Sequence, residues 1–522
     1  MKTTPPVQPR PGWPNWFYLP VMPAVWCKEL RAVLLPWLFL LVTPSFLLLR
    51  WGQDAVFEAY VVYGLGCLAL GAAVLGHELV SRTLSILLAQ PVERAQVWSQ
   101  KMVVLGVALG TGALCPALLL LAATEGDSFL IQSWASHPCA RAGWLLGPLV
   151  SALCVAPWLT LVTRSALASV VFSVFFPCVL WQGSGLFDWL VRTGYARLNV
   201  SPGHWVLDLQ AISFALLLLA YWFLGWLQGR WVFRHMDVIE GEARDLSTAA
   251  WAKSGLGTWF STMPVGRVSA VRQILMKELH LQQVSFLIAA LYVGSWLTML
   301  ALWWLKPTAM MEIFAPTTIL YVIVSALCVG ASSFAEERGL GTWEWQLTLP
   351  VSAWRQWCIK TAAALCVGVT LAAGLASLLL ASTPASFGLG WQDLGSPWTL
   401  ACLAIAMVAL AMHASSLVCG TVKGILVSVP IGIGLISIVQ ACFESAWDEN
   451  REGLLTAWTH ALPLNPRAFC WVFFSGLGVM LWLWFGYHNY RRLGSVRQRL
   501  CWQCVALAIF AMTAGFVSAV LI

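Results

Sequence analysis

Two short charged segments interrupt a chain that is otherwise largely apolar. Residues 76–101 read GHELVSRTLSILLAQPVERAQVWSQK, and residues 335–360 read AEERGLGTWEWQLTLPVSAWRQWCIK. In each, charged side chains precede a proline, which ends a helix because it cannot continue the hydrogen-bond ladder. Such a polar helix can bind a soluble partner through its charges. A loop that merely holds two spans in register would explain one copy, but two copies at matching positions favour docking.

No enzyme active site is evident in the sequence. The chain lacks the Gly-x-x-x-x-Gly-Lys-Ser/Thr phosphate loop, since GTVKG at 420–424 has the wrong spacing and follows an apolar stretch. His77-Glu78 lacks the second histidine of a zinc-protease helix. Cys501 and Cys504 form an isolated pair without further ligands. We therefore expect no catalytic residue, no metal site and no cofactor in this chain.

The elements that carry the charged segments are expected to be membrane helices. Hydrophobic residues make up 59% of the chain and charged residues 10%, whereas soluble domains average roughly 45–50% and about 25%. Apolar stretches of about 20 residues cross a bilayer as helices. We predict an all-α polytopic membrane protein with about 13 spans, near residues 32–50, 55–75, 98–123, 145–163, 166–187, 208–230, 281–304, 317–334, 357–382, 397–416, 424–443, 468–488 and 503–522.

The basic residues predict the orientation. With the N-terminus in the cytosol, most of the 30 Lys and Arg residues fall in cytosolic loops, as the positive-inside rule requires. Residues 1–23 are rich in Pro and Trp and lack the apolar core of a secretory signal. We expect an integral protein of a bacterial inner (plasma) membrane. Its net charge of +7 then belongs to the inner face of the lipid bilayer, with no nucleic-acid partner.

The chain contains an internal duplication. Lys28-Glu29-Leu30 recurs as Lys277-Glu278-Leu279, and Glu78, Thr83, Leu88, Pro91, Trp98 and Lys101 recur 259 positions later as Glu337, Thr342, Leu347, Pro350, Trp357 and Lys360. Each half contains six of the predicted spans. Because six is an even number, both halves have the same orientation in the membrane, and the repeat is parallel. We expect a first half at 1–233 with a polar helix at 76–94, a cytosolic linker at 234–265, a second half at 266–495 with a polar helix at 335–355, and an additional C-terminal span at 496–522.

These motifs resemble the type-2 ATP-binding-cassette export permeases. The resemblance rests on Lys-Glu-Leu before the first span and on Glu-Glu-Arg…Gly-Thr-x-Glu…Leu-Pro-Val-Ser after the second. It covers nearly the whole chain, with one six-span permease domain per half. It implies that the polar segments are coupling helices docking on two separate ATPase subunits or domains, which hold ATP and Mg. It also implies that the Lys-Glu segments belong to amphipathic elbow helices in the membrane plane.

The resemblance assigns residues to both kinds of helix. The coupling residues are Glu78, Arg82, Thr83, Pro91, Glu336, Glu337, Arg338, Gly341, Thr342, Glu344 and Pro350, and the elbow residues are Lys28, Glu29, Lys277 and Glu278. Thr83 is expected to cap a short helix. The first half departs from the family pattern, because His77 replaces the first Glu, Arg82 the Gly and Ser85 the last Glu. Its docking is therefore expected to be weaker or chemically different.

In that family the route for cargo runs between the halves, along the second and fifth spans of each. The residues that match candidate pathway positions are Tyr60, Tyr63, Ser173, Pro177, Ser428, Pro430, Ser437 and Gln440. Ordinary helix packing explains small residues and prolines at these positions equally well. If the route is there, its lining favours an apolar or amphipathic cargo.

Two other functions remain open. A secondary transporter of six-plus-six architecture would need ion-coupling groups inside its spans, and almost none are evident, since Glu58 and His413 lie near span ends. A non-transporting membrane scaffold worked by an ATPase, with additional membrane or envelope subunits, fits the sequence as well as an exporter does.

Overall fold

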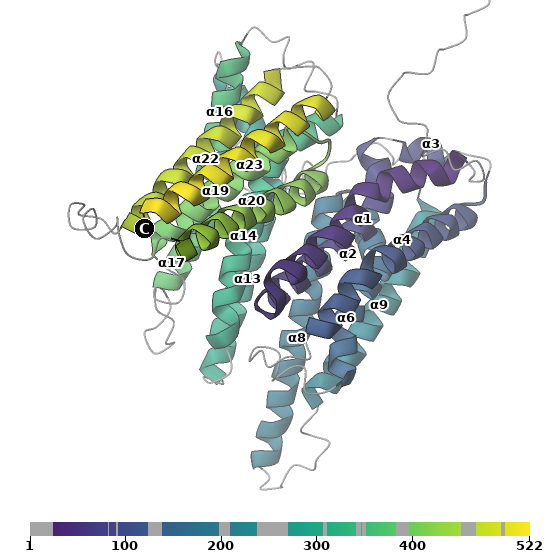
Figure 1. The fold of residues 1–522 in the computed structure, drawn as a ribbon. Helices are drawn as coiled ribbons and strands as arrows, with labels where there is room; N and C mark the ends of the chain where they lie inside the picture. The colour runs from purple at the N-terminus through teal and green to yellow at the C-terminus, as the bar shows by residue number, and fades with distance from the viewer. Residues whose placement is uncertain are drawn as a thin grey trace, which may run out of the picture.

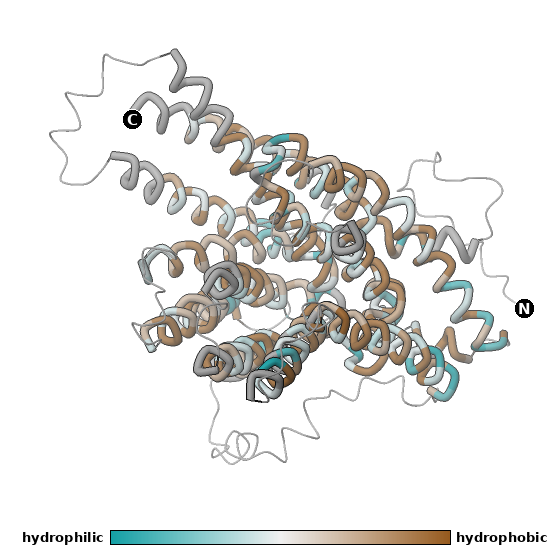
Figure 2. The backbone as a smooth tube through the Cα atoms, turned by 90° about the horizontal axis from the view of Figure 1, so that it is seen from below, coloured by the Kyte–Doolittle hydropathy of each residue, from teal (hydrophilic) through white to brown (hydrophobic). Residues whose placement is uncertain are grey.

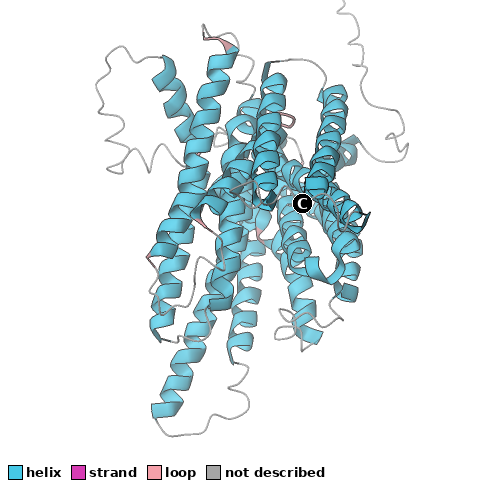
Figure 3. Ribbon diagram, turned by 60° about the vertical axis from the view of Figure 1, so that its left-hand side comes forward, coloured by secondary structure: helices cyan, strands magenta, loops and turns pink. Residues whose placement is uncertain are grey.

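In the computed structural model, the described residues form helices and connecting turns, without strands (Figure 3). They are residues 24–81, 83–89, 92–123, 138–197, 209–236, 270–305, 311–340, 346, 351–382, 396–449, 466–491 and 496–521. Ten described helices are long and apolar enough to cross a membrane, or eleven if one bent pair counts as a single span. The expectation of an all-α polytopic membrane protein is therefore confirmed.

The helices of the first half follow the predicted spans. They are α1 (Ala24–Trp51), α2 (Val56–Val80), the short α3 (Leu84–Leu88), α4 (Arg94–Ala123), α6 (Pro138–Cys154), α7 (Ala156–Thr163), α8 (Ala166–Arg197) and α9 (Leu209–His235). The predicted fourth span is broken, since its two parts, 145–154 and 156–163, meet at an angle of 42°. Pro157 lies in the first turn of α7, where no backbone donor is needed.

The second half has the same order of long helices. They are α12 (Ala270–Leu281), α13 (Gln283–Leu305), α14 (Met311–Leu340), α16 (Ala353–Gly368) with a π-helical turn at Val369–Gly374 and α17 (Leu375–Ala381), α19 (Pro397–Ser415), α20 (Thr421–Glu449) and α22 (Pro466–Arg491), followed by α23 (Val496–Leu521). Each predicted span coincides with a described helix or helix pair. Because α22 and α23 are not among the ten or eleven, the count of 13 stays a prediction.

The polar segments and elbows differ in detail from the sequence-based expectation. Instead of one polar helix over 76–94, α2 continues to Val80 and the separate α3 has five residues. The backbone carbonyl of Thr83 accepts the first helical hydrogen bond of α3, from the amide of Leu87. In the second half the elbow segment is a helix of its own, α12, parted from α13 by Gln282. In the first half Glu29 lies within the continuous α1.

The helices gather into two bundles, one per half of the chain (Figure 1). The first bundle has its own core of buried side chains, which includes Leu40, Tyr63 and Leu105. The second has a separate core, which includes Val329 and Val408. Most helices are hydrophobic along much of their length (Figure 2), and many large apolar side chains are exposed, such as Leu216, Phe223 and Trp231 on α9. Lipid satisfies such a surface, whereas water would not.

The two bundles are joined by a reciprocal exchange between α8 and α20. Leu167 on α8 belongs to the core of the second bundle, where it joins Ile288 and Ala289 of α13. Leu426 on α20 belongs to the core of the first bundle, beside α1. Each predicted fifth span thus packs on the first span of the other half. The exchange lies near the N-terminal end of both fifth spans.

Two glycines at matching positions of the predicted repeat allow close helix packing. Gly71 on α2 faces the backbone carbonyl of Ala152 on α6, and Gly330 on α14 faces that of Val408 on α19. At both positions a Cβ atom would overlap the carbonyl oxygen. The backbone of a fourth span cannot move away without disturbing its own helix, so only glycine fits here.

This packing predicts that Gly71→Ala and Gly330→Ala each lower the free energy of unfolding by about 1–3 kcal/mol, the usual cost of overpacking. Gly110→Ala on α4 is the control, because a Cβ there meets open space. Thermal denaturation of the purified chain in detergent measures the effect. Equal midpoints for Gly71→Ala and Gly110→Ala would show that the close contact is not rigid.

Candidate functional site

A buried charge cluster joins three helices of the first half. The ammonium nitrogen of Lys101, on α4, lies 2.7 Å from a carboxylate oxygen of Glu29, on α1, and 3.3 Å from one of Glu78, on α2. The side chains of Lys101 and Glu78 are 2% and 1% exposed. The hydroxyl of Thr83 donates to the second oxygen of Glu78. Thr83 therefore binds this carboxylate with its side chain while its carbonyl begins α3.

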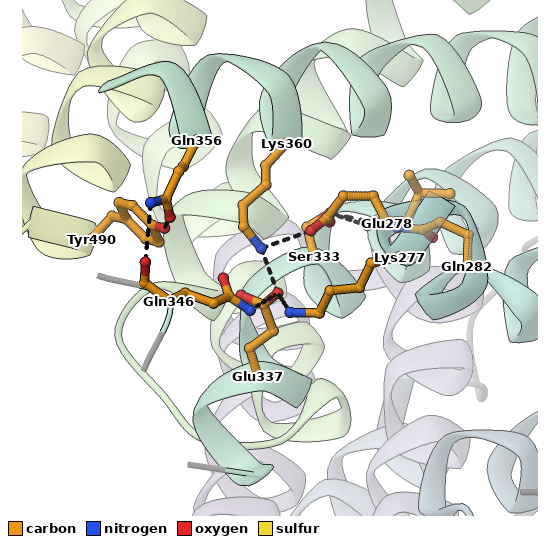
Figure 4. A network of polar contacts seen from close by, with 10 residues as sticks. Lys277, Glu278, Gln282, Ser333, Glu337, Gln346, Gln356, Lys360 and Tyr490 are labelled. Carbon is orange, nitrogen blue, oxygen red and sulfur yellow. Dashed lines mark hydrogen bonds and ion pairs between the residues drawn. The ribbon is translucent and has the colours of Figure 1, made fainter. Parts of the chain in front are cut away.

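The equivalent cluster of the second half has more members (Figure 4). The ammonium nitrogen of Lys360, on α16, lies 2.7 Å from Glu278 on α12 and 2.5 Å from Glu337 on α14. Lys277, which is 42% exposed, approaches the same Glu337 oxygen at 2.6 Å. The side-chain amide of Gln346 donates to that oxygen as well, at 2.7 Å. Glu337 is thus held from three directions.

Pairing is what permits these charges to be buried. An isolated buried charge costs several kcal/mol, and a pair is tolerated only where geometry and hydrogen bonds compensate. Lys101 and Lys360 each neutralise one of two carboxylates, and Lys277 supplies a second positive charge in the second half. Burial raises the pKa of the Glu278 carboxyl, although the Lys360 ammonium opposes the shift. Glu278 therefore takes up a proton more readily than an exposed glutamate.

Each cluster holds the two ends of a polar segment together. Glu78 lies near the start of the first segment and Lys101 at its end, and their side chains meet. Glu337 and Lys360 bracket the second segment in the same way. The lysine also holds a glutamate of the elbow segment. The first cluster therefore joins the first three spans of its half, and the second cluster joins the separate helix α12 to the second and third spans.

An aromatic contact beside each cluster fastens the sixth span. The indole of Trp98 packs over Gly229 of α9, and that of Trp357 packs over Gly486 of α22. Both indoles are buried. A side chain larger than hydrogen at either glycine would meet the ring. These matching contacts align the two sixth spans with one another, with Gly486 as the counterpart of Gly229, 257 positions earlier.

The remaining predicted coupling residues lie around the second cluster or outside the described part of the chain. Glu336 accepts a hydrogen bond from Thr421 on α20, and Arg338 donates to the backbone carbonyl of Asn489 on α22. The residues outside the described part are Arg82, Pro91, Gly341, Thr342, Glu344 and Pro350. The same holds for the side chain of Lys28.

The candidate pathway residues do not form one group. The Tyr63 hydroxyl donates to the Leu145 carbonyl, 3.1 Å away, so it ties α2 to α6. The Ser428 and Ser437 hydroxyls bond to carbonyls within α20 itself. Tyr60 is partly buried on α2, Ser173 is buried on α8, and Pro177 and Pro430 lie inside α8 and α20; the side chain of Gln440 lies outside the described part. Their pathway role stays a prediction.

Sequence reasoning missed the central members of the clusters. It used Lys101 and Lys360 only as markers of the duplication, although both occur inside stretches predicted to span the membrane. An ionisable residue in such a stretch is itself a sign of a functional site. Gln346, Gln356 and Tyr490 carried no sequence signal, because their partners lie on other helices.

Comparison with known proteins does not identify a functional site, so the site is assigned from these contacts. No family model, no curated protein and no solved structure matches the chain. Within the described residues, no group of three or more His, Cys, Asp or Glu side chains is placed to hold a metal ion. The two charge clusters are thus the candidate functional sites.

The pairing predicts that Lys360→Met destabilises the chain by about 3–5 kcal/mol, because Glu278 and Glu337 lose the cation between them. Arg355→Met, an exposed cation on the same helix, is the control and should change little. Thermal denaturation in detergent compares the two. A triple variant with Glu278→Gln and Glu337→Gln added to Lys360→Met should recover much of the loss, and a Lys360→Met midpoint equal to that of Arg355→Met would contradict a compensating role for the lysine.

Proposed function

We propose that the chain is the membrane permease of an ATP-driven exporter, worked by separate ATPase subunits that bind the two polar segments. The single observation that carries this proposal is the buried ion pair that holds the two ends of each segment together. A buried lysine ties the two ends of the segment to one another and to the elbow segment. A loop that only links two spans does not need charges buried at such cost.

A segment whose ends are held by ion pairs can transmit force to the helices that carry those pairs. Hydrogen-bonded ion pairs fix both distance and direction, so they do not slide as apolar contacts do. A push on the segment from outside the membrane then shifts the three helices of its cluster together. Two such segments, one per half, fit two ATPase subunits per chain, with ATP and Mg held on those subunits.

The docking surface consists of residues other than the clustered glutamates. Glu78 and Glu337 are buried, so a partner reaches neither without opening the cluster. The first segment exposes Ile86 on α3 at 64% and Val92 at 41%, and Glu93 beside them is also exposed. The segment thus offers exposed apolar side chains and a carboxylate within eight residues of sequence, the mixture that protein interfaces use.

The proposed cargo route lies between α8 and α20. The exchange of Leu167 and Leu426 closes the two bundles against one another near one end of these helices. Farther along, Val179 and Phe187 on α8 and Ile436 on α20 are exposed. Such a lining favours an apolar or amphipathic cargo, and displacement of the helices that carry the clusters would open the closed end.

Affinity purification of the tagged chain from its native membrane tests the proposal. We expect an ATP-hydrolysing subunit to co-purify, and ATP-dependent movement of a fluorescent amphipathic probe in vesicles to require both components. Co-purification without movement of any probe would favour a scaffold worked by the ATPase. Movement driven by an ion gradient, with no ATPase bound, would favour a secondary transporter.

The exposed side chains of the first segment predict that Ile86→Asp lowers the amount of ATPase that co-purifies with the chain several-fold, because a charge replaces an exposed apolar side chain at the proposed interface. Glu58→Lys is the control, since Glu58 is exposed at the opposite end of α2. Quantitative immunoblotting of the purified complex measures the ratio of subunits. Unchanged recovery with Ile86→Asp would place docking elsewhere on the chain.

A further inference from the structure

Two polar paths leave neighbouring residues of α14 and end on neighbouring residues of α22. The first begins at Glu337, which accepts from the Gln346 amide. The backbone carbonyl of Gln346 accepts from the amide nitrogen of Gln356, at 3.0 Å. The side-chain oxygen of Gln356 accepts from the hydroxyl of Tyr490, at 2.7 Å (Figure 4). The charge cluster is thereby connected to the sixth span of its half.

The second path begins at Arg338. Its guanidinium donates to the carbonyl of Asn489, at 3.2 Å. The side chain of Asn489 then forms a reciprocal amide pair with Gln503 on α23, with hydrogen bonds of 3.1 and 2.9 Å. Asn489 also donates to the hydroxyl of Ser416 at the end of α19, at 3.0 Å. The chain's last helix is therefore fastened through the same turn of α22.

The first half has apolar side chains at every matching position. The register of 259 positions across the polar segments, and of 257 across the sixth spans, pairs Arg338, Gln346, Gln356, Asn489 and Tyr490 with Leu79, Leu87, Val97, Val232 and Phe233. All five apolar side chains belong to the first core or pack against it. Phe233 is fully buried and lacks the hydroxyl that Tyr490 uses.

The sixth span of the first half is tied to α4, the helix that carries Lys101, by other hydrogen bonds. Arg94, at the start of α4, donates to the carbonyls of Arg234 and Met236, at 2.9 and 2.7 Å. These carbonyls lie at the C-terminal end of α9. Arg94 is not a member of the charge cluster, but it shares α4 with Lys101 and with Trp98, which packs over Gly229. Buried hydrogen bonds resist displacement because breaking one leaves a polar group without water, whereas apolar surfaces slide with little penalty.

We infer that α22 and α23 move with the charge cluster of the second half, through Gln356, Tyr490 and Asn489 as positioning residues, whereas α9 follows only α4 of the first half, through Arg94 and Trp98. The inference rests on the proposed function for the source of the movement. It assigns the two halves different roles: the second responds as one body, including α23, and the first passes the movement to its sixth span through α4.

Hydrogen–deuterium exchange of the full chain in detergent tests the connection without any ATPase. Tyr490→Phe removes one oxygen and makes the position like Phe233. We expect amides near the C-terminal end of α22 to exchange about fivefold faster, the effect of losing one hydrogen bond. Tyr487→Phe removes the same atom one turn earlier, from an aromatic contact with Trp354 that uses no hydroxyl, and should leave exchange unchanged.

A second variant addresses the path to α23. Gln503→Leu should speed exchange at the start of α23 severalfold and leave α9 as it is in the wild type. Equal exchange for Tyr490→Phe and Tyr487→Phe, or an equal rise in α9, would overturn the inference. With an ATPase bound, nucleotide should alter exchange in α22 of the wild type, and Tyr490→Phe should abolish that response. If no ATPase binds, the proposed function fails, while the comparison of single variants still decides the connection.

Discussion

The structure depends on compensating charge in a place where water is excluded. Lys101 and Lys360 each hold two carboxylates at hydrogen-bonding distance, and of these two lysines and four glutamates all but Glu29 are no more than 3% exposed. If any one of these charges were buried without a partner, its desolvation penalty would exceed the free energy gained from packing the helices together. The pairs therefore fix the relative position of the helices that carry them. The ends of both polar segments are held together by this constraint.

The fold class was predictable from composition, because an apolar chain with so few charges has to be built from helices in lipid. The positions of the spans were predictable for the same reason. The elbow of the first half was not, since α1 runs on without a break past Glu29, whereas the matching Glu278 lies on the separate helix α12. Local sequence also suggested one polar helix over 76–94, whereas the burial of Glu78 keeps α2 helical to Val80.

The candidate site was only half visible in the sequence. The recurrence of Glu78 and Lys101 as Glu337 and Lys360 marked the right residues, but spacing alone cannot tell an exposed docking charge from a buried one. That distinction depends on which helix packs opposite. The link from Gln356 to Tyr490 joins residues 134 positions apart, and no periodicity within either helix announces it.

The exchange of Leu167 and Leu426 between the bundles has an evolutionary consequence. Reciprocal contacts of this kind are what two identical subunits make around a twofold axis, where every substitution appears twice. Once both units are covalently joined, their encounter no longer depends on concentration, and a substitution on one side is not copied to the other. Differences between the halves, such as Tyr490 in one and Phe233 at the matching position of the other, can then accumulate without loss of assembly.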